Sequence, residues 1–242
     1  MSMTLLEVIT EFCQRTGLEA PLVICASTDL SALQFKGLAN EVITDITGRG
    51  NSWPLLQKQA TWTSPGTAGG SQGTLATLFP YGFKYIIPAT AYDRTDRRIL
   101  FGPKSPQLWQ ESLALPFTGP FYAYRIWQGS FYIQPDLEIG HTIALEYASD
   151  WAIQATAAGA YKRRFTADTD VFVLDEEMLL MGLRWKWKKE KGLTFVTEKL
   201  EYESYLAQCM GNDGTKGELN MNGPVQPEIK PGIWVSAGNW PL

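Results

Sequence analysis

Few side chains in this 242-residue sequence have the types and spacing that catalysis or metal binding requires. It holds one histidine, His141, beside Gly140 at the start of a predicted strand, and we interpret it as structural or surface-exposed. No pair of cysteines or histidines has metal-ligand spacing. Phosphate-binding, dinucleotide-binding and nucleophile-elbow motifs are missing from the sequence. The residues therefore predict no catalytic group, no cofactor site and no metal site.

The acidic residues are scattered, and their tightest group is Asp168-Thr169-Asp170. That group could hold a cation, but a solvated loop before a helix is the favoured interpretation. Asp175 with Glu176 and Glu177 is explained by a helix N-cap and its acidic first turn. A glycan hydrolase would need two carboxylates about 5–10 Å apart. Nothing in the sequence brings the available candidates together, which are Glu111, Glu138 and Glu146.

Net charge and cysteine content indicate which binding partners and which compartment suit this protein. The net charge of −4 indicates no general attraction to nucleic acid or anionic lipid. The basic run Trp185–Lys189 could stack on nucleic acid, although a solvated basic face with buried tryptophans is favoured. Three widely spaced cysteines are typical of a reducing compartment. The start of the chain has no signal-peptide pattern, and no window is apolar enough for a membrane span.

Amphipathic helices are predicted at the N-terminal end of the chain. Residues 4–7 form a capping box, Thr4-Leu5-Leu6-Glu7, and the helix that follows ends at Gly17. A second helix begins near Ser27 or Thr28 and ends at Gly48.

A second helical pair is predicted between residues 174 and 211. Asp175 caps its first helix, lysines crowd the last turns, and Gly192 ends it. Thr194 can cap the next helix, which runs to Met210. Because two amphipathic pairs flank the rest of the chain, packing them together as a four-helix bundle is the most economical arrangement.

The segment between the pairs alternates like β-structure. Gln128-Gly129 marks a hairpin turn, Ser105-Pro106 starts a short helix, and the Gly- and Ser-rich residues Ser64–Gly73 indicate a mobile loop. We expect a small antiparallel sandwich or barrel. The predicted strands are Gln57–Ser64, Gly73–Phe79, Ala91–Asp93, Arg98–Phe101, Phe121–Trp127, Ser130–Gln134 and Thr142–Tyr147.

The last part of the chain, residues 211–242, is rich in Gly, Asn and Pro and cannot build its own core. It nevertheless carries large apolar side chains, which predict an extended arm that orders against a partner. The predicted partner-binding residues are Ile233, Trp234, Val235 and Trp240.

The predicted fold class is therefore α+β. The helical bundle is formed by residues 1–52 and 154–210, the inserted β-rich domain by residues 53–153, and the C-terminal arm by residues 211–242.

The order of several stretches resembles the head–tail adaptor of short-tailed bacteriophages, the type called tail tubular protein A. These stretches together cover most of residues 60–210. They are Tyr124–Gly129, Phe131–Pro135, His141–Tyr147, Phe165–Asp170 with Leu174–Glu176, Gly182–Lys188, Lys191–Leu193 and Glu201–Glu203.

The resemblance implies a structural virion protein with no catalytic residues. It implies a helical bundle with a β-rich insertion, made in the host cytoplasm and assembled as a dodecameric ring beneath the portal protein. Such a ring contacts the tail nozzle protein and the neighbouring adaptor subunits. It continues the channel through which genomic DNA passes without sequence-specific binding, and it does not involve a membrane. Two alternatives remain from the residues themselves, a virion-associated peptidoglycan hydrolase and a carbohydrate-binding β module.

Overall fold

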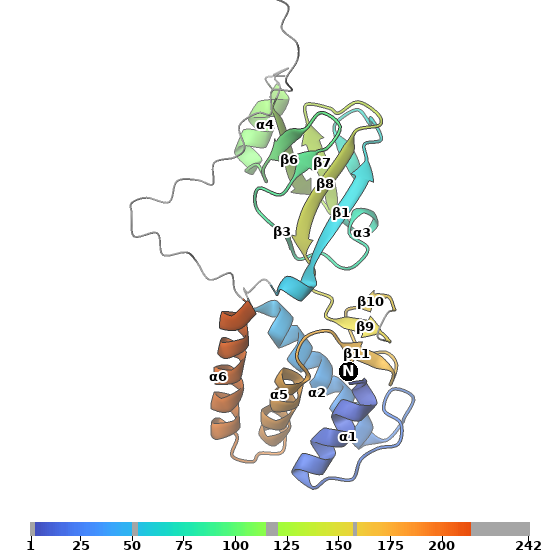
Figure 1. Ribbon diagram of the computed structural model, residues 1–242, viewed down its shortest axis with the longest axis vertical. Helices are drawn as coiled ribbons and strands as arrows, with labels where there is room; N and C mark the ends of the chain where they lie inside the picture. Colours follow the sequence, from blue (N-terminus) through green and yellow to red (C-terminus); the bar gives the residue numbers. More distant parts are fainter. Residues whose placement is uncertain (1–2, 50–52, 115–120, 157–158, 214–242) are drawn as a thin grey trace, which may run out of the picture.

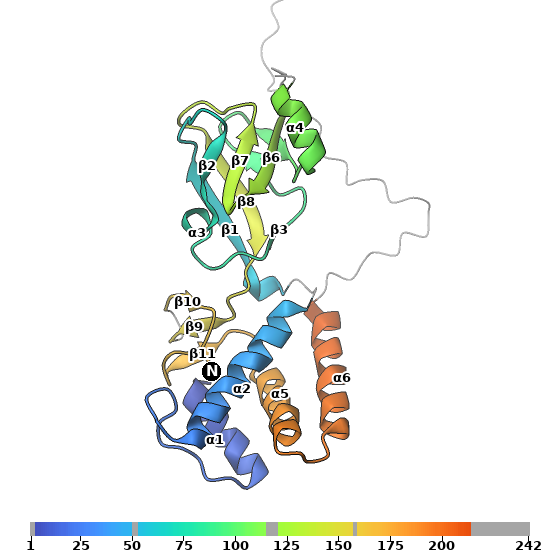
Figure 2. The ribbon, with the colours of Figure 1, turned by 180° about the vertical axis from the view of Figure 1, so that it is seen from behind.

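The computed structural model describes residues 3–49, 53–114, 121–156 and 159–213. The chain forms a helical part and a β part, one above the other and joined near the short 3-10 helix η1 at Pro54–Leu56 (Figures 1 and 2). The α-helices are α1 (Leu5–Thr16), α2 (Leu30–Gly48), α3 (Leu75–Leu78), α4 (Pro106–Ala114), α5 (Glu176–Glu190) and α6 (Val196–Asp213).

Eleven strands are present among the described residues. The β part holds β1 (Gln57–Thr63), β2 (Ser71–Thr74), β3 (Tyr85–Ile86), β4 (Tyr92–Asp93), β5 (Arg98–Phe101), β6 (Tyr122–Trp127), β7 (Ser130–Gln134) and β8 (Thr142–Ala148). A second, small sheet beside the helices holds β9 (Ile153–Ala155), β10 (Tyr161–Lys162) and β11 (Asp170–Phe172).

The helix ends follow local chemistry. Thr4 and Glu7 form the predicted capping box of α1, and Gly17 ends that helix in the left-handed region at φ 70°. The Asp175 side chain accepts a hydrogen bond from the Glu177 N–H at the start of α5. At the start of α4, the Leu108 N–H donates to Ser105 Oγ, which confirms the predicted short helix.

The predicted four-helix bundle is wrong. Helix α5 packs against α1, α2 and α6, but α1 and α2 do not form a paired hairpin. The small sheet occupies the remaining side, and Thr4 pairs with Val171 of β11. Three side chains from residues 153–172, Ile153, Phe165 and Phe172, are buried in the same core as the helices. Strands of two or three residues are too short to show alternation, so the sequence pattern concealed them.

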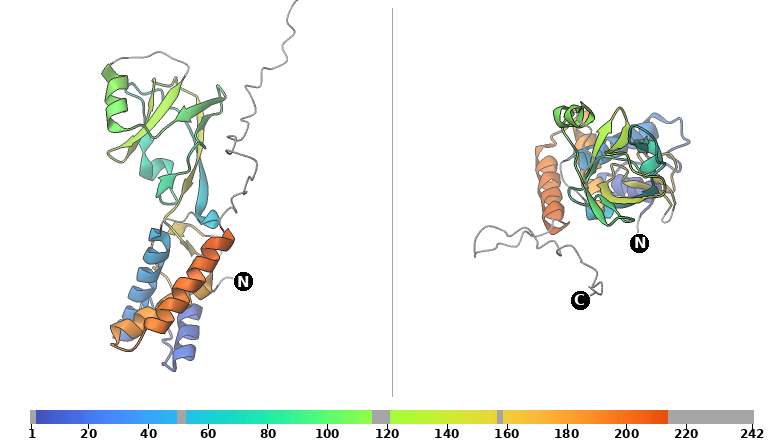
Figure 3. Two further views of the ribbon diagram at one scale, coloured as in Figure 1. Left: turned by 90° about the vertical axis from the view of Figure 1, so that its left-hand side faces the viewer. Right: turned by 90° about the horizontal axis from the view of Figure 1, so that it is seen from above.

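The predicted antiparallel sandwich or barrel is also wrong. The β part is one eight-stranded mixed sheet in the order β1-β8-β4-β5-β6-β7-β2, with β3 also paired to β8, and it curls into a half-barrel (Figure 3). Strands β5 and β6 are parallel. A parallel neighbour requires a crossover, and α4 lies on the connection between these two strands. The concave side encloses a second core that includes Phe79, Tyr124, Phe131 and Tyr147.

Three local predictions are corrected as well. Strand β2 ends at Thr74, and residues predicted as strand form α3, where the Thr74 hydroxyl accepts from the Thr77 N–H. Helix α6 begins at Val196, beyond the predicted Thr194 cap. The predicted mobile loop at residues 64–73 is bonded to its surroundings, since Gly69 N–H donates to Asp136 and the Ile133 N–H donates to the Gly70 carbonyl.

Two lysines connect the two parts of the molecule. Lys84 Nζ lies 2.5 Å from the Thr47 carbonyl oxygen and 2.8 Å from that of Arg49, at the C-terminal end of α2. Lys58 of β1 donates to the Tyr161 hydroxyl at 2.7 Å. The Lys84 ammonium therefore donates hydrogen bonds to two carbonyl groups at the C-terminal end of α2, where the helix dipole favours a positive charge.

The predicted arm lies almost entirely outside the described residues. Residues 211–213 belong to α6. The predicted partner-binding residues all lie in the part that the structure does not describe, and their role stays a prediction. They are Ile233, Trp234, Val235 and Trp240. The predicted division at residues 1–52, 53–153, 154–210 and 211–242 likewise stays a prediction.

Candidate functional site

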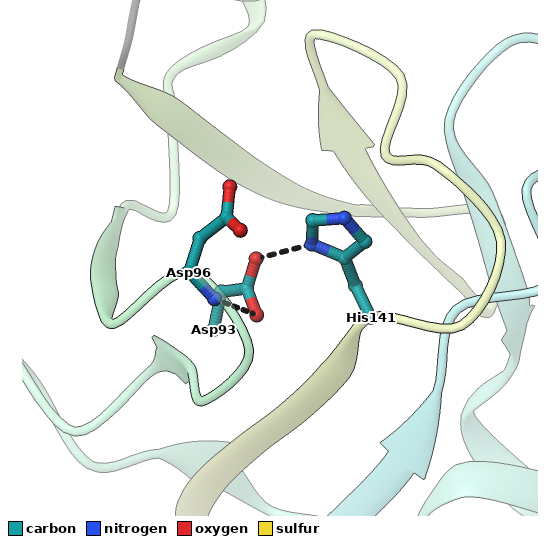
Figure 4. A group of neighbouring side chains, drawn as sticks. All are labelled: Asp93, Asp96 and His141. Atoms are coloured by element: carbon teal, nitrogen blue, oxygen red, sulfur yellow. Dashed lines mark hydrogen bonds and ion pairs between the residues drawn. The ribbon is translucent and has the colours of Figure 1, made fainter.

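A histidine and two aspartates meet at one end of the half-barrel (Figure 4). Asp93 ends β4, Asp96 follows in the turn to β5, and His141 immediately precedes β8. One ligand atom from each residue lies within 4.8 Å of the other two. His141 Nδ1 is 2.7 Å from Asp93 Oδ2, and the Asp93 side chain is fully buried.

Backbone hydrogen bonds hold the three residues in place. The other oxygen of Asp93 accepts from the Thr95 N–H at 2.9 Å and the Asp96 N–H at 3.4 Å. The Thr142 N–H donates to Thr95 Oγ1, and the Arg94 N–H donates to the Thr142 carbonyl. The turn is therefore bonded to the start of β8 by its backbone as well as by the His141 imidazole.

The electrostatics favour a protonated imidazole. The hydrogen bond from Asp93 raises the pKa of His141, burial opposes this, and the charges of Asp93, Asp96 and Glu138 raise it further. Asp96 also lies beside Arg98, with 3.7 Å between the oxygen and nitrogen atoms. Each carboxylate of the group therefore already has a nitrogen neighbour, the His141 imidazole for Asp93 and the Arg98 guanidinium for Asp96.

The chemistry open to this group is limited. One imidazole nitrogen and two carboxylates are a donor set that can hold a divalent cation. Both Asp93 oxygens, however, already accept hydrogen bonds, and Asp96 has a cationic neighbour. Among the described residues, no hydroxyl or thiol is hydrogen-bonded to the second ring nitrogen of His141, which is the contact that an activated side-chain nucleophile has. We interpret the pair as an ion pair that joins the β4–β5 turn to β8.

This interpretation predicts a pH dependence. A raised folded-state pKa means that the ion pair stabilises fully below the unfolded value of about 6.5 and loses this contribution as pH rises through the folded pKa. His141→Gln should therefore lower the melting temperature at pH 6 more than at pH 9. Thermal melts of both proteins at the two pH values test this, and an equal loss at both would contradict it.

The acidic group at residues 168–170 is neither a solvated loop nor an open cation site. Asp170 is buried, pairs with Lys162 at 2.8 Å, and accepts from the Thr166 and Ala167 N–H groups. Asp168 accepts from the N–H groups of Ile24 and Cys25, at 3.1 and 2.7 Å. Burial acts to raise both aspartate pKa values, but the hydrogen bonds and nearby lysines lower them below the usual range.

The other sequence candidates also have structural partners or lie apart. Lys186 in the basic run is buried and pairs with Glu41 at 2.8 Å, while Lys188 pairs with Glu198. The predicted solvated basic face is therefore only partly correct. The three carboxylates considered for glycan cleavage lie on different elements: Glu111 on α4, Glu138 between β7 and β8, and Glu146 on β8.

Sequence reasoning missed Asp93 and Asp96. The only available signal was an acidic turn between two short strands in a chain with one histidine. His141 lies 48 positions from Asp93, and only the pairing of β4 with β8 brings them together.

Comparison of the sequence with models of known protein families and with curated protein sequences gave no match. Within the described residues, no helix combines the length and the apolar character needed to cross a bilayer.

Proposed function

We propose that this chain is a head–tail adaptor subunit that joins a portal to a tail nozzle and continues the DNA channel. The proposal starts from the resemblance of residues 60–210 to the adaptors of short-tailed bacteriophages. One observation of the fold supports it most: among the large apolar side chains that are exposed, Val196 and Leu200 lie one helical turn apart on α6 and form an apolar surface that a protein neighbour can cover. The large apolar side chains that are more than half exposed are Leu22, Leu30, Leu55, Leu108, Phe121, Ile139, Val196 and Leu200.

The charge of the chain is compatible with a conduit. A channel wall that bound DNA phosphates tightly would oppose passage of the genome, and a net charge of −4 provides no such attraction. No catalytic step is needed for this role.

The direct experiment mixes the purified protein with portal-bearing heads. We expect the isolated protein to be monomeric in dilute solution and to form a ring on the portal, because the portal supplies a template for assembly. Light scattering and electron microscopy of both samples measure this. A stable dimer with and without the portal would be inconsistent with an adaptor.

The C-terminal residues provide a further prediction. Truncation after Asp213 removes no part of α6 and none of the described core, so the melting temperature should stay within about 2 °C of the full-length value. Loss of Ile233, Trp234, Val235 and Trp240 should reduce joining to portal-bearing heads at least tenfold, because burying each Trp is worth about 3 kcal/mol. A truncated protein that melts early yet still assembles would contradict this docking role.

A carbohydrate-binding module is the second candidate. Trp127 is partly exposed at the end of β6, and its ring centroid is 6.0 Å from the ring centroid of Tyr132. The Arg125 guanidinium lies 5.9 Å from the Trp127 ring centroid. Aromatic faces beside a polar cation can stack on sugar rings. Glycan binding that Trp127→Ala abolishes would favour this candidate, and cleavage of peptidoglycan in a zymogram would favour the hydrolase.

A further inference from the structure

The outer side of α6 carries an apolar stripe with no partner among the described residues. Val196 and Leu200 are one helical turn apart and are 59% and 64% exposed, and Leu193 precedes them. The opposite side of the same helix is in the core, where Tyr202 and Leu206 are fully buried. We call Leu193, Val196 and Leu200 the α6 stripe.

The connection between α1 and α2 forms a hollow of about 610 Å³. Its lining includes Ala20, Pro21, Leu22, Val23 and Ala26. Leu22 is 92% exposed, and Leu30 at the adjoining start of α2 is 83% exposed. We call this feature, within residues 19–31, the connection hollow.

These two features lie on opposite sides of the helical part. Figures 1 and 2 both show α6 at one edge and the connection between α1 and α2 at the other. One copy therefore cannot bring its own α6 stripe to its own connection hollow. Two copies can do so, and the contact would use a different surface on each copy.

The charges of the two surfaces are complementary. Residues 188–200 contain four lysines and two glutamates, whereas residues 19–31 contain two acidic residues and no basic residue. Among the described residues, Lys189 forms no salt bridge, and neither do Glu19 and Asp29, which line the hollow. Lys199 lies 5.9 Å from the centroid of the Trp185 ring, and its charge also acts on Glu203. Opposite charges around an apolar centre favour one orientation of approach.

We infer that the α6 stripe of one copy docks in the connection hollow of the next copy. This is a heterologous contact, so it propagates from copy to copy and closes into a ring when the rotation between copies allows. The inference rests on the proposed adaptor function for its biological setting, and it names the surfaces by which neighbouring subunits would meet.

The test uses two single variants, Leu22→Asp and Leu200→Asp, in the full-length protein. Sedimentation velocity over a wide concentration range should show wild-type species larger than a dimer at high concentration. Each variant alone should be monomeric, with association weakened at least about tenfold by a charge at the apolar centre. An equimolar mixture retains one intact contact between unlike variants and should form dimers and nothing larger.

A matched control shows whether the loss of association is specific to these two surfaces. Leu113→Asp places the same charge at a position that is 48% exposed on α4, which the inferred contact does not use, and it should associate like wild type. Circular dichroism melts should match wild type for all three variants, because each site is on the surface. A Leu22→Asp variant that still associates like wild type, a mixture that stays monomeric, or a wild-type protein that never associates would overturn the inference.

The adaptor proposal can fail separately. If the mixture of Leu22→Asp and Leu200→Asp forms dimers but the wild-type protein does not bind portal-bearing heads, the contact between copies stands and the adaptor function is wrong. A ring on the portal that both Leu→Asp variants join as well as wild type would retain the adaptor function and reject the contact.

Discussion

Gly70→Ala should lower the free energy of unfolding by about 3 kcal/mol or more. Gly70 has φ 72°, and a Cβ atom there would lie 2.0 Å from the Ile133 carbonyl oxygen. A non-glycine residue in this region costs about 1–2 kcal/mol by itself. The overlap then forces apart β7 and the loop, which would break the 2.9 Å hydrogen bond from the Ile133 N–H to the Gly70 carbonyl.

Gly69→Ala is the matched control for that change. Gly69 also has a positive φ, at 83°, but a Cβ atom there would meet nothing within 4 Å. The loss in unfolding free energy for Gly69→Ala should be limited to the backbone cost of about 1–2 kcal/mol. Urea denaturation followed by circular dichroism measures both. Small, equal losses would mean that residues 64–73 form the mobile loop that their composition predicted.

Asp170→Ala should destabilise the helical part by about 3–5 kcal/mol, because it leaves the Lys162 ammonium and two backbone N–H groups without their acceptor. Asp170 is fully buried, so water cannot replace the lost oxygens without opening the site. Urea denaturation compared with Asp150→Ala tests this. Asp150 pairs with the well-exposed Arg163 at 3.6 Å, and its loss should stay below about 1 kcal/mol.

The same residue predicts an acid dependence. The folded-state pKa of Asp170 is lowered, so its contribution is present above the unfolded value of about 3.9 and is lost as pH falls through the folded pKa. The difference in stability between wild type and Asp170→Ala should therefore shrink below pH 4. A difference that stays constant down to pH 2 would contradict the charged role of Asp170.

The sequence predicted features whose causes lie within a few residues. The capping box of Thr4 and Glu7, the left-handed Gly17 and the Asp175 cap are all local hydrogen-bond or backbone effects. The hairpin at Gln128-Gly129 also formed as predicted, with φ values of 48° and 72° at its two turn residues. Such elements depend on neighbours in the chain, so a single sequence is enough to find them.

Pairings between distant residues were decided by the tertiary structure. Three contacts join segments that only the fold brings together. They are the parallel pairing of β5 with β6, the small sheet that packs beside the helices, and the ion pair of Asp93 with His141. Amphipathic patterns show that a helix has an apolar face, but many partners can cover that face equally well. Asp168 and Asp170 illustrate the same limit. Their sequence predicted a solvated loop. In the structure, Asp168 is half-buried and accepts from Ile24 and Cys25, whereas Asp170 is buried and pairs with Lys162, because the fold supplies donors whose positions the sequence alone does not reveal.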